Sequence, residues 1–230
     1  MFIGHFGVAL AAKRIAPRTS LGTLVMAAQF VDLLWPVFLL LGLERVIIAP
    51  GNTAVTPLDF ISYPLSHSLF ADLGWACLFA GIYKLVNRDS RGAACLWFVV
   101  LSHWVLDALS HRPDLPLYPG SATYVGLGLW NSRFWTVFVE GAIFAFGAMT
   151  YARTTPIRDR IGFFAFRSFI ALLLFYLLNI FGPPPPSEKA VALGALGLWF
   201  FVVWAYWLDR HRTTISPPPQ KALTILDHLS

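Results

Sequence analysis

The feature that most constrains this chain is a series of apolar runs, each long enough to cross a lipid bilayer. A transmembrane helix needs about 20 predominantly apolar residues. Six runs reach that length, at roughly 22–43, 66–86, 91–109, 132–151, 161–182 and 188–208, and a shorter apolar segment, 2–12, precedes them. Only 13% of the 230 residues are charged, about half the share of a soluble domain. We therefore predict an all-α fold, a polytopic membrane helix bundle with about six transmembrane helices plus a short N-terminal half-helix.

The basic residues predict how such a bundle is oriented, because Lys and Arg are enriched in cytoplasmic connections. Twelve of the seventeen fall on one side of the predicted spans: Lys13, Arg14, Arg18, Lys84, Arg88, Arg91, Arg153, Arg158, Arg160, Arg210, Arg212 and Lys221. We expect a multi-pass protein with both termini in the cytoplasm and with the long connections 44–65 and 110–131 outside. The net charge of +5 then reflects topology, and we expect no nucleic-acid partner.

The two ends of the chain differ from the spans. The first stretch, MFIGHFGVALAAKR, has its basic pair after the apolar residues and lacks a small-residue cleavage site. It is therefore expected to be a retained segment rather than a signal peptide. The C-terminal stretch contains a run of three prolines and no apolar run of spanning length. We divide the chain into a single transmembrane domain, residues 1–212, and a flexible cytoplasmic tail, residues 213–230.

The stretch LSHWVLDALSH, residues 101–111, places ionisable side chains on an otherwise apolar helix. His103 and Asp107 are four residues apart and lie on one helix face, and His111 extends the same stripe by another turn. Ionisable groups inside a membrane are costly unless they face a partner or a cavity. We therefore expect His103 and Asp107 to face the bundle interior, and Val105 and Leu109 to face the other way.

Other ionisable residues fall at a similar predicted depth. At about 1.5 Å per helical residue, His103 lies about 18 Å from Arg91. The residues of this layer are Asp32, His67, Asp72, His103, Asp107 and Glu140, with His5 a little deeper in the N-terminal segment. Four spans thus send acids or histidines to the outer half of a hydrocarbon core that is about 30 Å thick. Such convergence favours one shared site over several separate polar contacts.

The residue types in this layer suit a metal ion. Imidazole and carboxylate groups are ligands of zinc and manganese, and a tetrahedral zinc takes four donors. The sequence leaves simpler interpretations open. A histidine in a membrane can hydrogen-bond to a neighbouring helix. Asp72 and Glu140 can bond to Ser or Trp donors or pair with Arg133, and His111 can be a solvated loop residue.

Four motifs of the chain resemble those of a known family. GHFGVALA (4–11), FVDLLWP (30–36), SHSL (66–69) and LSHWVLDALSHRPDLPLYP (101–119) occur in an order similar to that of the bacterial YdjM-like inner-membrane metal-dependent hydrolases. That family is distantly similar to zinc-dependent phospholipase C. The resemblance covers roughly residues 4–120 and implies a bacterial inner-membrane protein that binds a divalent metal, zinc or alternatively manganese. It implies the following metal-binding set: His5, Asp32, His67, His103 and Asp107.

The chain departs from the family pattern at two places. The second motif of the family typically reads Pro-Asp-Ile-Asp-His, whereas Leu34 and Trp35 stand here in place of its second acid and its histidine. The residues before His67 read SYPL (62–65), where the family usually has His-Arg-Gly. The resemblance therefore implies one metal ion rather than a two-metal clamp on a phosphodiester.

The function expected from these residues is a membrane-embedded metal-dependent hydrolase that acts near the outer leaflet on a lipid or amphiphilic (phospho)ester. A metal-bound water supplies hydroxide near neutral pH, and Asp72 or Glu140, as a buried carboxylate, is a candidate general base. The phosphoester rests on the resemblance alone. The alternatives are a divalent-cation or proton transporter and a non-catalytic membrane subunit with a vestigial metal site. A transporter needs polar residues through the whole depth of its helices, which the inner segments 92–100 and 144–151 lack.

Overall fold

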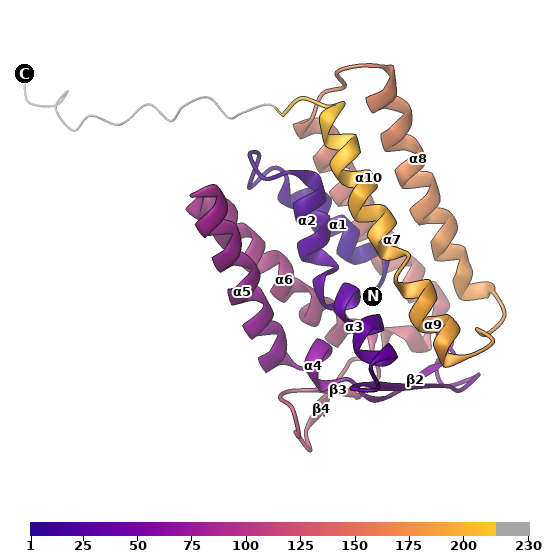
Figure 1. Ribbon diagram of the computed structural model, residues 1–230. Coiled ribbons are helices and arrows are strands. Elements are labelled where there is room, and N and C mark those ends of the chain that lie inside the picture. Colours follow the sequence, from indigo (N-terminus) through magenta and orange to yellow (C-terminus); the bar gives the residue numbers. More distant parts are fainter. Residues whose placement is uncertain (215–230) are drawn as a thin grey trace, which may run out of the picture.

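The computed structural model describes residues 1–214, except for the side chain of Asn179, as a helix bundle with two small β-hairpins at one end (Figure 1). Its helices are α1 (Ile3–Ala12), α2 (Leu21–Ala28), α3 (Phe30–Leu40), α4 (Pro64–His67), α5 (Leu69–Asn87), α6 (Ser90–Ser110), α7 (Arg133–Thr154), α8 (Arg160–Leu177), α9 (Glu188–Ala195) and α10 (Leu198–Arg210). Two short 3-10 helices cover Leu129–Asn131 and Leu178–Phe181. The predicted all-α bundle is confirmed. The predicted tail lies outside the described residues from residue 215 onward.

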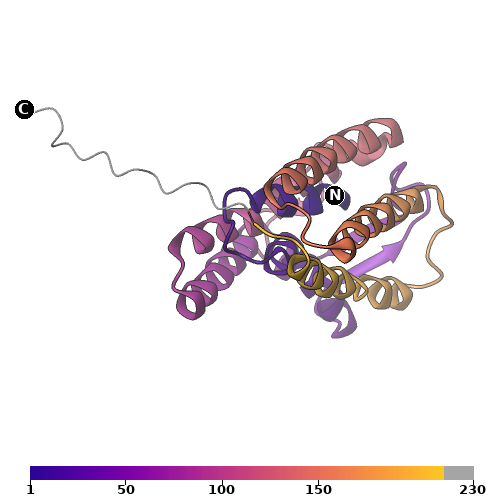
Figure 2. The ribbon, with the colours of Figure 1, turned by 90° about the horizontal axis from the view of Figure 1, so that it is seen from above.

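Within the described residues, five helical segments are long and apolar enough to cross a membrane: α5, α6, α7, α8 and the α9–α10 pair. The α2–α3 pair passes the same test if it is counted as one bent span, which gives up to six. Figure 2, seen from above, shows these helices arranged around α1. Their lengths and composition are those of a multi-pass membrane protein.

The long helices begin at polar side chains that cap them. Ser68, Asp89, Ser132 and Asp159 each accept a hydrogen bond from the backbone N–H three residues later. Such caps satisfy donors that have no partner inside the helix. The caps thus explain why α5, α6, α7 and α8 start where they do.

The first predicted span, 22–43, is not one continuous helix. It breaks between α2 and α3, whose axes differ in direction by 54°. The break lies at Gln29, whose backbone (φ −104°, ψ 10°) leaves helical geometry although the residue is fully buried. Pro36, the helix breaker that the sequence displays, sits inside α3 without ending it. The predicted first span is therefore a bent pair of helices, and the break exposes backbone groups at the end of α2.

Helix α1 lies inside the bundle, where it contacts α7, α2 and α6. Ile3, Phe6 and Leu10 are fully buried. The closest approach is between α1 and α7: a methyl group added to Gly147 would lie 2.0 Å from the carbonyl oxygen of Gly7. Small residues at such crossings let membrane helices pack backbone against backbone. The predicted N-terminal half-helix is confirmed, and it is a central element of the core.

The connections 44–65 and 110–131 lie together at one end of the bundle (Figure 1). The first forms the antiparallel hairpin of β1 (Arg45–Ile48) and β2 (Leu58–Ser62), and the second contains β3 (Leu115–Pro116) and β4 (Tyr124–Val125). Arg112 joins them through an ion pair with Asp59 of β2. A small apolar cluster lies beneath: Trp35, Val46, Tyr63 and Leu115. This end of the fold therefore forms a cap over α4 and the end of α6.

A candidate metal centre

Five ionisable side chains from four helices converge beneath this cap. His5 comes from α1, Asp32 from α3, His67 from the end of α4, and His103 and Asp107 from α6. His5, His67, His103 and Asp107 are at most 5% exposed. The Asp32 side chain is 22% exposed, so it marks the side on which the cluster can be reached. The predicted interior stripe of α6 is confirmed, since Val105 on the other side of the helix is 57% exposed.

Four distances between histidine nitrogens and carboxylate oxygens in the cluster are close to those between ligands of one metal ion. His67 Nε2 lies 3.3 Å from Asp32 Oδ1 and 3.7 Å from Asp107 Oδ2. His103 Nε2 lies 3.6 Å from Asp32 Oδ1 and 3.2 Å from Asp107 Oδ2. Four donors held about 2.1 Å from a tetrahedral zinc are about 3.4 Å from one another. The four histidine–carboxylate distances are therefore similar to ligand spacings, whereas Asp32 and Asp107 belong to different ligand groups.

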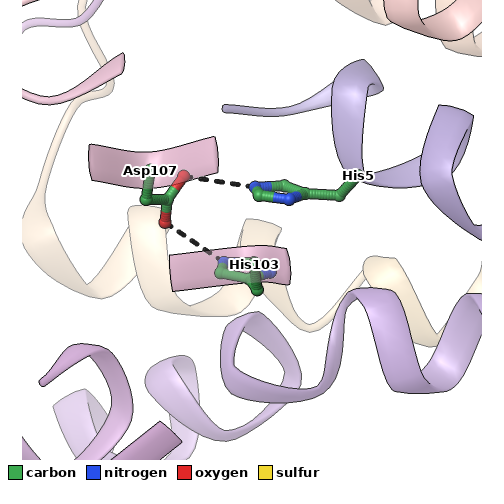
Figure 3. Close-up of side chains that lie close together, drawn as sticks. All are labelled: His5, His103 and Asp107. Carbon is green, nitrogen blue, oxygen red and sulfur yellow. Dashed lines mark hydrogen bonds and ion pairs between the residues drawn. The ribbon is translucent and has the colours of Figure 1, made fainter. Parts of the chain in front are cut away.

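His5 approaches the same carboxylate from the other side, as Figure 3 shows. Its Nε2 lies 3.2 Å from Asp107 Oδ1, and its ring stacks on that of His103 with centroids 3.7 Å apart. The Met1 amino group also contacts Asp107 Oδ1. Asp107 thus uses one oxygen toward His103 and His67 and the other toward His5, which makes it the central acid of the cluster.

The broken helix orients His103. The last carbonyls of a helix have no partner within it, and the Ala28 carbonyl, in the last turn of α2, accepts a hydrogen bond from His103 Nδ1 at 2.7 Å. That bond places the imidazole proton on Nδ1 and leaves the Nε2 lone pair toward the cluster. Nε2 is buried and has no hydrogen-bond partner among residues 1–214. A bound cation would satisfy it, as metal-ligating histidines usually donate their other N–H to a carbonyl or carboxylate.

A pair of polar residues that no sequence pattern indicated, Glu44 and Ser66, orients His67. Glu44 accepts a hydrogen bond from Ser66 Oγ at 2.7 Å, and Ser66 Oγ lies 2.6 Å from His67 Nδ1. Because the hydroxyl proton goes to Glu44, the Ser66 oxygen accepts from His67 Nδ1, and Nε2 again points to the cluster with a free lone pair. Glu44 is only 4% exposed. The one sign of this role in the sequence is that Glu44 directly follows an apolar run.

His111 is buried rather than solvated. It is 3% exposed, and its Nδ1 lies 3.0 Å from Asp114 Oδ1 and 3.3 Å from the Tyr63 hydroxyl. Burial lowers the pKa of His111, and burial together with Asp114 raises the pKa of Tyr63. The interpretation as a wet loop residue is therefore wrong. His111 Nε2 remains 3.9 Å from Asp107 Oδ2, so it lies behind the central acid and outside the set of five.

The two predicted catalytic carboxylates have different surroundings. Glu140 Oε2 accepts hydrogen bonds from the backbone N–H groups of Phe2 (2.8 Å) and Gly4 (3.4 Å) at the start of α1. These bonds favour a positioning role, because they hold the helix that carries His5. Asp72 is 1% exposed, and neither of its carboxylate oxygens has a hydrogen-bond partner within the described part of the chain. Asp72 therefore lacks the hydrogen bonds that hold Glu140.

The residues present fit one metal ion. Two groups have donor atoms that all lie within 4.8 Å of one another: His5, His103 and Asp107, and Asp32, His67 and His103. Both groups use His103, whose Nδ1 is already bonded to Ala28, so His103 offers a single lone pair. A buried set of three imidazoles and two carboxylates suits zinc or manganese. A divalent charge would also offset two carboxylates placed in apolar surroundings.

Comparisons of the chain with family models, with curated proteins and with solved structures find no match. The functional argument therefore rests on the residues of this chain and on the geometry described above.

Proposed function

We propose that this protein is a metal-dependent hydrolase of a membrane, acting on a lipid or another amphiphilic ester. The observation that carries the proposal is the convergence of two histidines and two aspartates from α3, α4 and α6, with histidine–carboxylate distances of 3.2–3.7 Å. In such a site a bound metal lowers the pKa of a water molecule and polarises an ester or phosphoester oxygen. Zinc is the first choice of ion, with manganese as the alternative.

The chain supplies the other parts of a hydrolytic site. Asp72 is the proposed general base, because it is buried and its carboxylate has no hydrogen-bond partner among residues 1–214. Asp32 is the most exposed of the five donors, so a substrate reaches the centre from the side of α3. Because the centre lies between membrane-spanning helices, the substrate must partition into the bilayer. An amphiphile that bears an ester or phosphoester meets that requirement.

Membership of the YdjM-like family is part of this proposal. It is supported by the four motifs, which contain each of the five converging residues. The placement in a bacterial inner membrane follows from the same resemblance. A cytoplasmic location of both termini is supported by the distribution of Lys and Arg, and it would put the metal centre toward the outer leaflet.

A transport function is less well supported. A path for ions needs polar groups through the inner half of the bundle. Beside α1, α6 and α7 in that half lies a cavity of about 410 Å³ whose lining is almost entirely apolar, including Val8, Ile15, Phe98 and Phe146. Such a lining favours a one-sided site over a conducting path.

The test is hydrolysis by the purified full-length protein in detergent, with phospholipids and with chromogenic phosphate and acyl esters. We expect turnover that a chelator abolishes and added zinc or manganese restores. Asp72→Asn should lower kcat by about 100-fold or more, the usual contribution of a general base, without changing metal content. Asp159→Asn, at the opposite end of the bundle, is the control. If the protein binds one metal ion per chain but hydrolyses none of these esters, the hydrolase proposal is wrong and the non-catalytic subunit is the better interpretation.

A further inference from the structure

A second polar site lies at the end of the bundle opposite the hairpins, where α7, α8 and α10 end or begin (Figure 1). There a cavity of about 370 Å³ is lined by apolar side chains, Ile157, Phe163 and Phe166 among them, and by two arginines, Arg167 and Arg212. Ala152, which also lines it, is twelve residues along α7 from Glu140, or about 18 Å. This cavity is therefore separate from the metal centre.

Arg212 is a buried cation with spare hydrogen-bond donors. It is 8% exposed, and its guanidinium lies over the rings of Phe166 (4.9 Å) and Tyr151 (5.4 Å). Nε donates to Thr155 Oγ1 at 3.1 Å and Nη1 to the Gly162 carbonyl at 3.4 Å. A guanidinium has five N–H donors, so three are left without a protein acceptor in the described part of the chain. No carboxylate there lies within 4.0 Å of it.

Arg167 is a cation inside a span. It lies seven residues into α8 from Arg160, about 10 Å along the helix, with its guanidinium 3.8 Å over the Phe163 ring. Among the described residues it has no ion-pair partner. Two acids at this end already have partners, Asp209 with Lys13 and Asp159 with His211. An arginine at such a depth is costly and normally has a counter-charge.

We propose that this cavity binds the phosphate of an anionic phospholipid between Arg167 and Arg212, with an acyl chain along Phe163 and Phe166. A guanidinium matches phosphate oxygens with two parallel hydrogen bonds, and basic pockets between membrane helices suit anionic head groups. The depth of Arg167 and the apolar lining favour a ligand that enters from the bilayer over a free phosphate ion. The site is distinct from the metal centre and does not depend on the proposed hydrolysis.

The test uses the full-length protein in detergent, with phosphatidylglycerol and phosphatidylcholine of the same chain length as probes. Native mass spectrometry counts the molecules of each lipid that remain bound. We expect the wild type to retain phosphatidylglycerol in preference to phosphatidylcholine. Arg167→Gln should weaken that binding about five- to tenfold, the effect of one phosphate-facing cation. Arg167 lines the cavity but is exposed, so the variant should fold, and Arg167→Lys should recover part of the binding.

The matched control is Arg91→Gln, which removes the same charge at the exposed start of α6, away from the cavity. It should bind phosphatidylglycerol as the wild type does. Equal losses in Arg167→Gln and Arg91→Gln would show attraction by overall charge and overturn the proposal. So would equal retention of the two lipids, or displacement of phosphatidylglycerol by inorganic phosphate at the same concentration.

Discussion

Replacing Asp107 by Asn tests the centre of the cluster while keeping the side-chain volume. Asp107 is 2% exposed, and its two oxygens lie 3.2 Å from His5 Nε2 and 3.2 Å from His103 Nε2, with His67 Nε2 at 3.7 Å. The amide replaces one acceptor oxygen by an NH₂ donor. It also removes the negative charge that the Asp107 carboxylate places beside three imidazoles. Loss of a group that orients ligands costs 10- to 100-fold in metal affinity, and loss of a direct ligand costs at least as much.

We therefore expect the metal dissociation constant of Asp107→Asn to rise by at least about 10- to 100-fold. This corresponds to a loss of about 1.4–2.7 kcal/mol in binding free energy. The assay is competition with a chromogenic chelator on the purified protein, together with elemental analysis. Asp159→Asn is the matched control, because Asp159 pairs with His211 at the opposite end of the bundle. If Asp107→Asn binds the metal with unchanged stoichiometry and affinity, the cluster is only a set of hydrogen bonds between helices.

Further predictions follow from the residues that hold the cluster. Ser66→Ala removes the acceptor of His67 Nδ1–H and should weaken metal binding about tenfold. Unchanged metal affinity in this variant would show that His67 is not a ligand. Gly147→Ala places a methyl group against α1, so it should lower the free energy of unfolding, measured by thermal denaturation, by about 1–3 kcal/mol and should lower the metal content. Gly141→Ala, on the same helix with open space around it, should change neither. Metal affinity should fall as the pH is lowered, because protons compete with the metal for the imidazole nitrogens; an affinity that does not depend on pH would speak against histidine ligands. In a cysteine-free background, a cysteine at Asn52 should react with an impermeant thiol reagent in intact cells and one at Asp89 should not, and the reverse pattern would invert the topology.

The sequence predicted those parts of the site that depend on periodicity along one helix. The spacing of His103 and Asp107 was enough to place both on the interior face of α6, because each step of a helix turns by a fixed angle. Shared depth also grouped His5, Asp32 and His67 with them. These inferences need only the length and direction of each helix, which hydropathy and the basic residues supply.

The parts that the sequence did not predict depend on contacts between segments far apart in the chain. The break at Gln29 has no glycine or proline to announce it, yet it provides the carbonyl that orients His103. The Glu44–Ser66–His67 series requires the connection after α3 to fold back over α4, which no local pattern indicates. The backbone N–H partners of Glu140 at the start of α1 likewise come from the packing of α7 against α1. In each case tertiary packing determines which polar group is used.

The most direct test of the central claim is elemental analysis of the purified wild type beside His103→Ala and His211→Ala. His211 pairs with Asp159 at the opposite end of the bundle, so it controls for the loss of a histidine. We predict about one divalent metal ion per chain in the wild type and in His211→Ala, and a near-complete loss in His103→Ala, which removes the one donor common to both ligand groups. A wild type without stoichiometric metal, or a His103→Ala variant that retains it, would contradict the proposed centre.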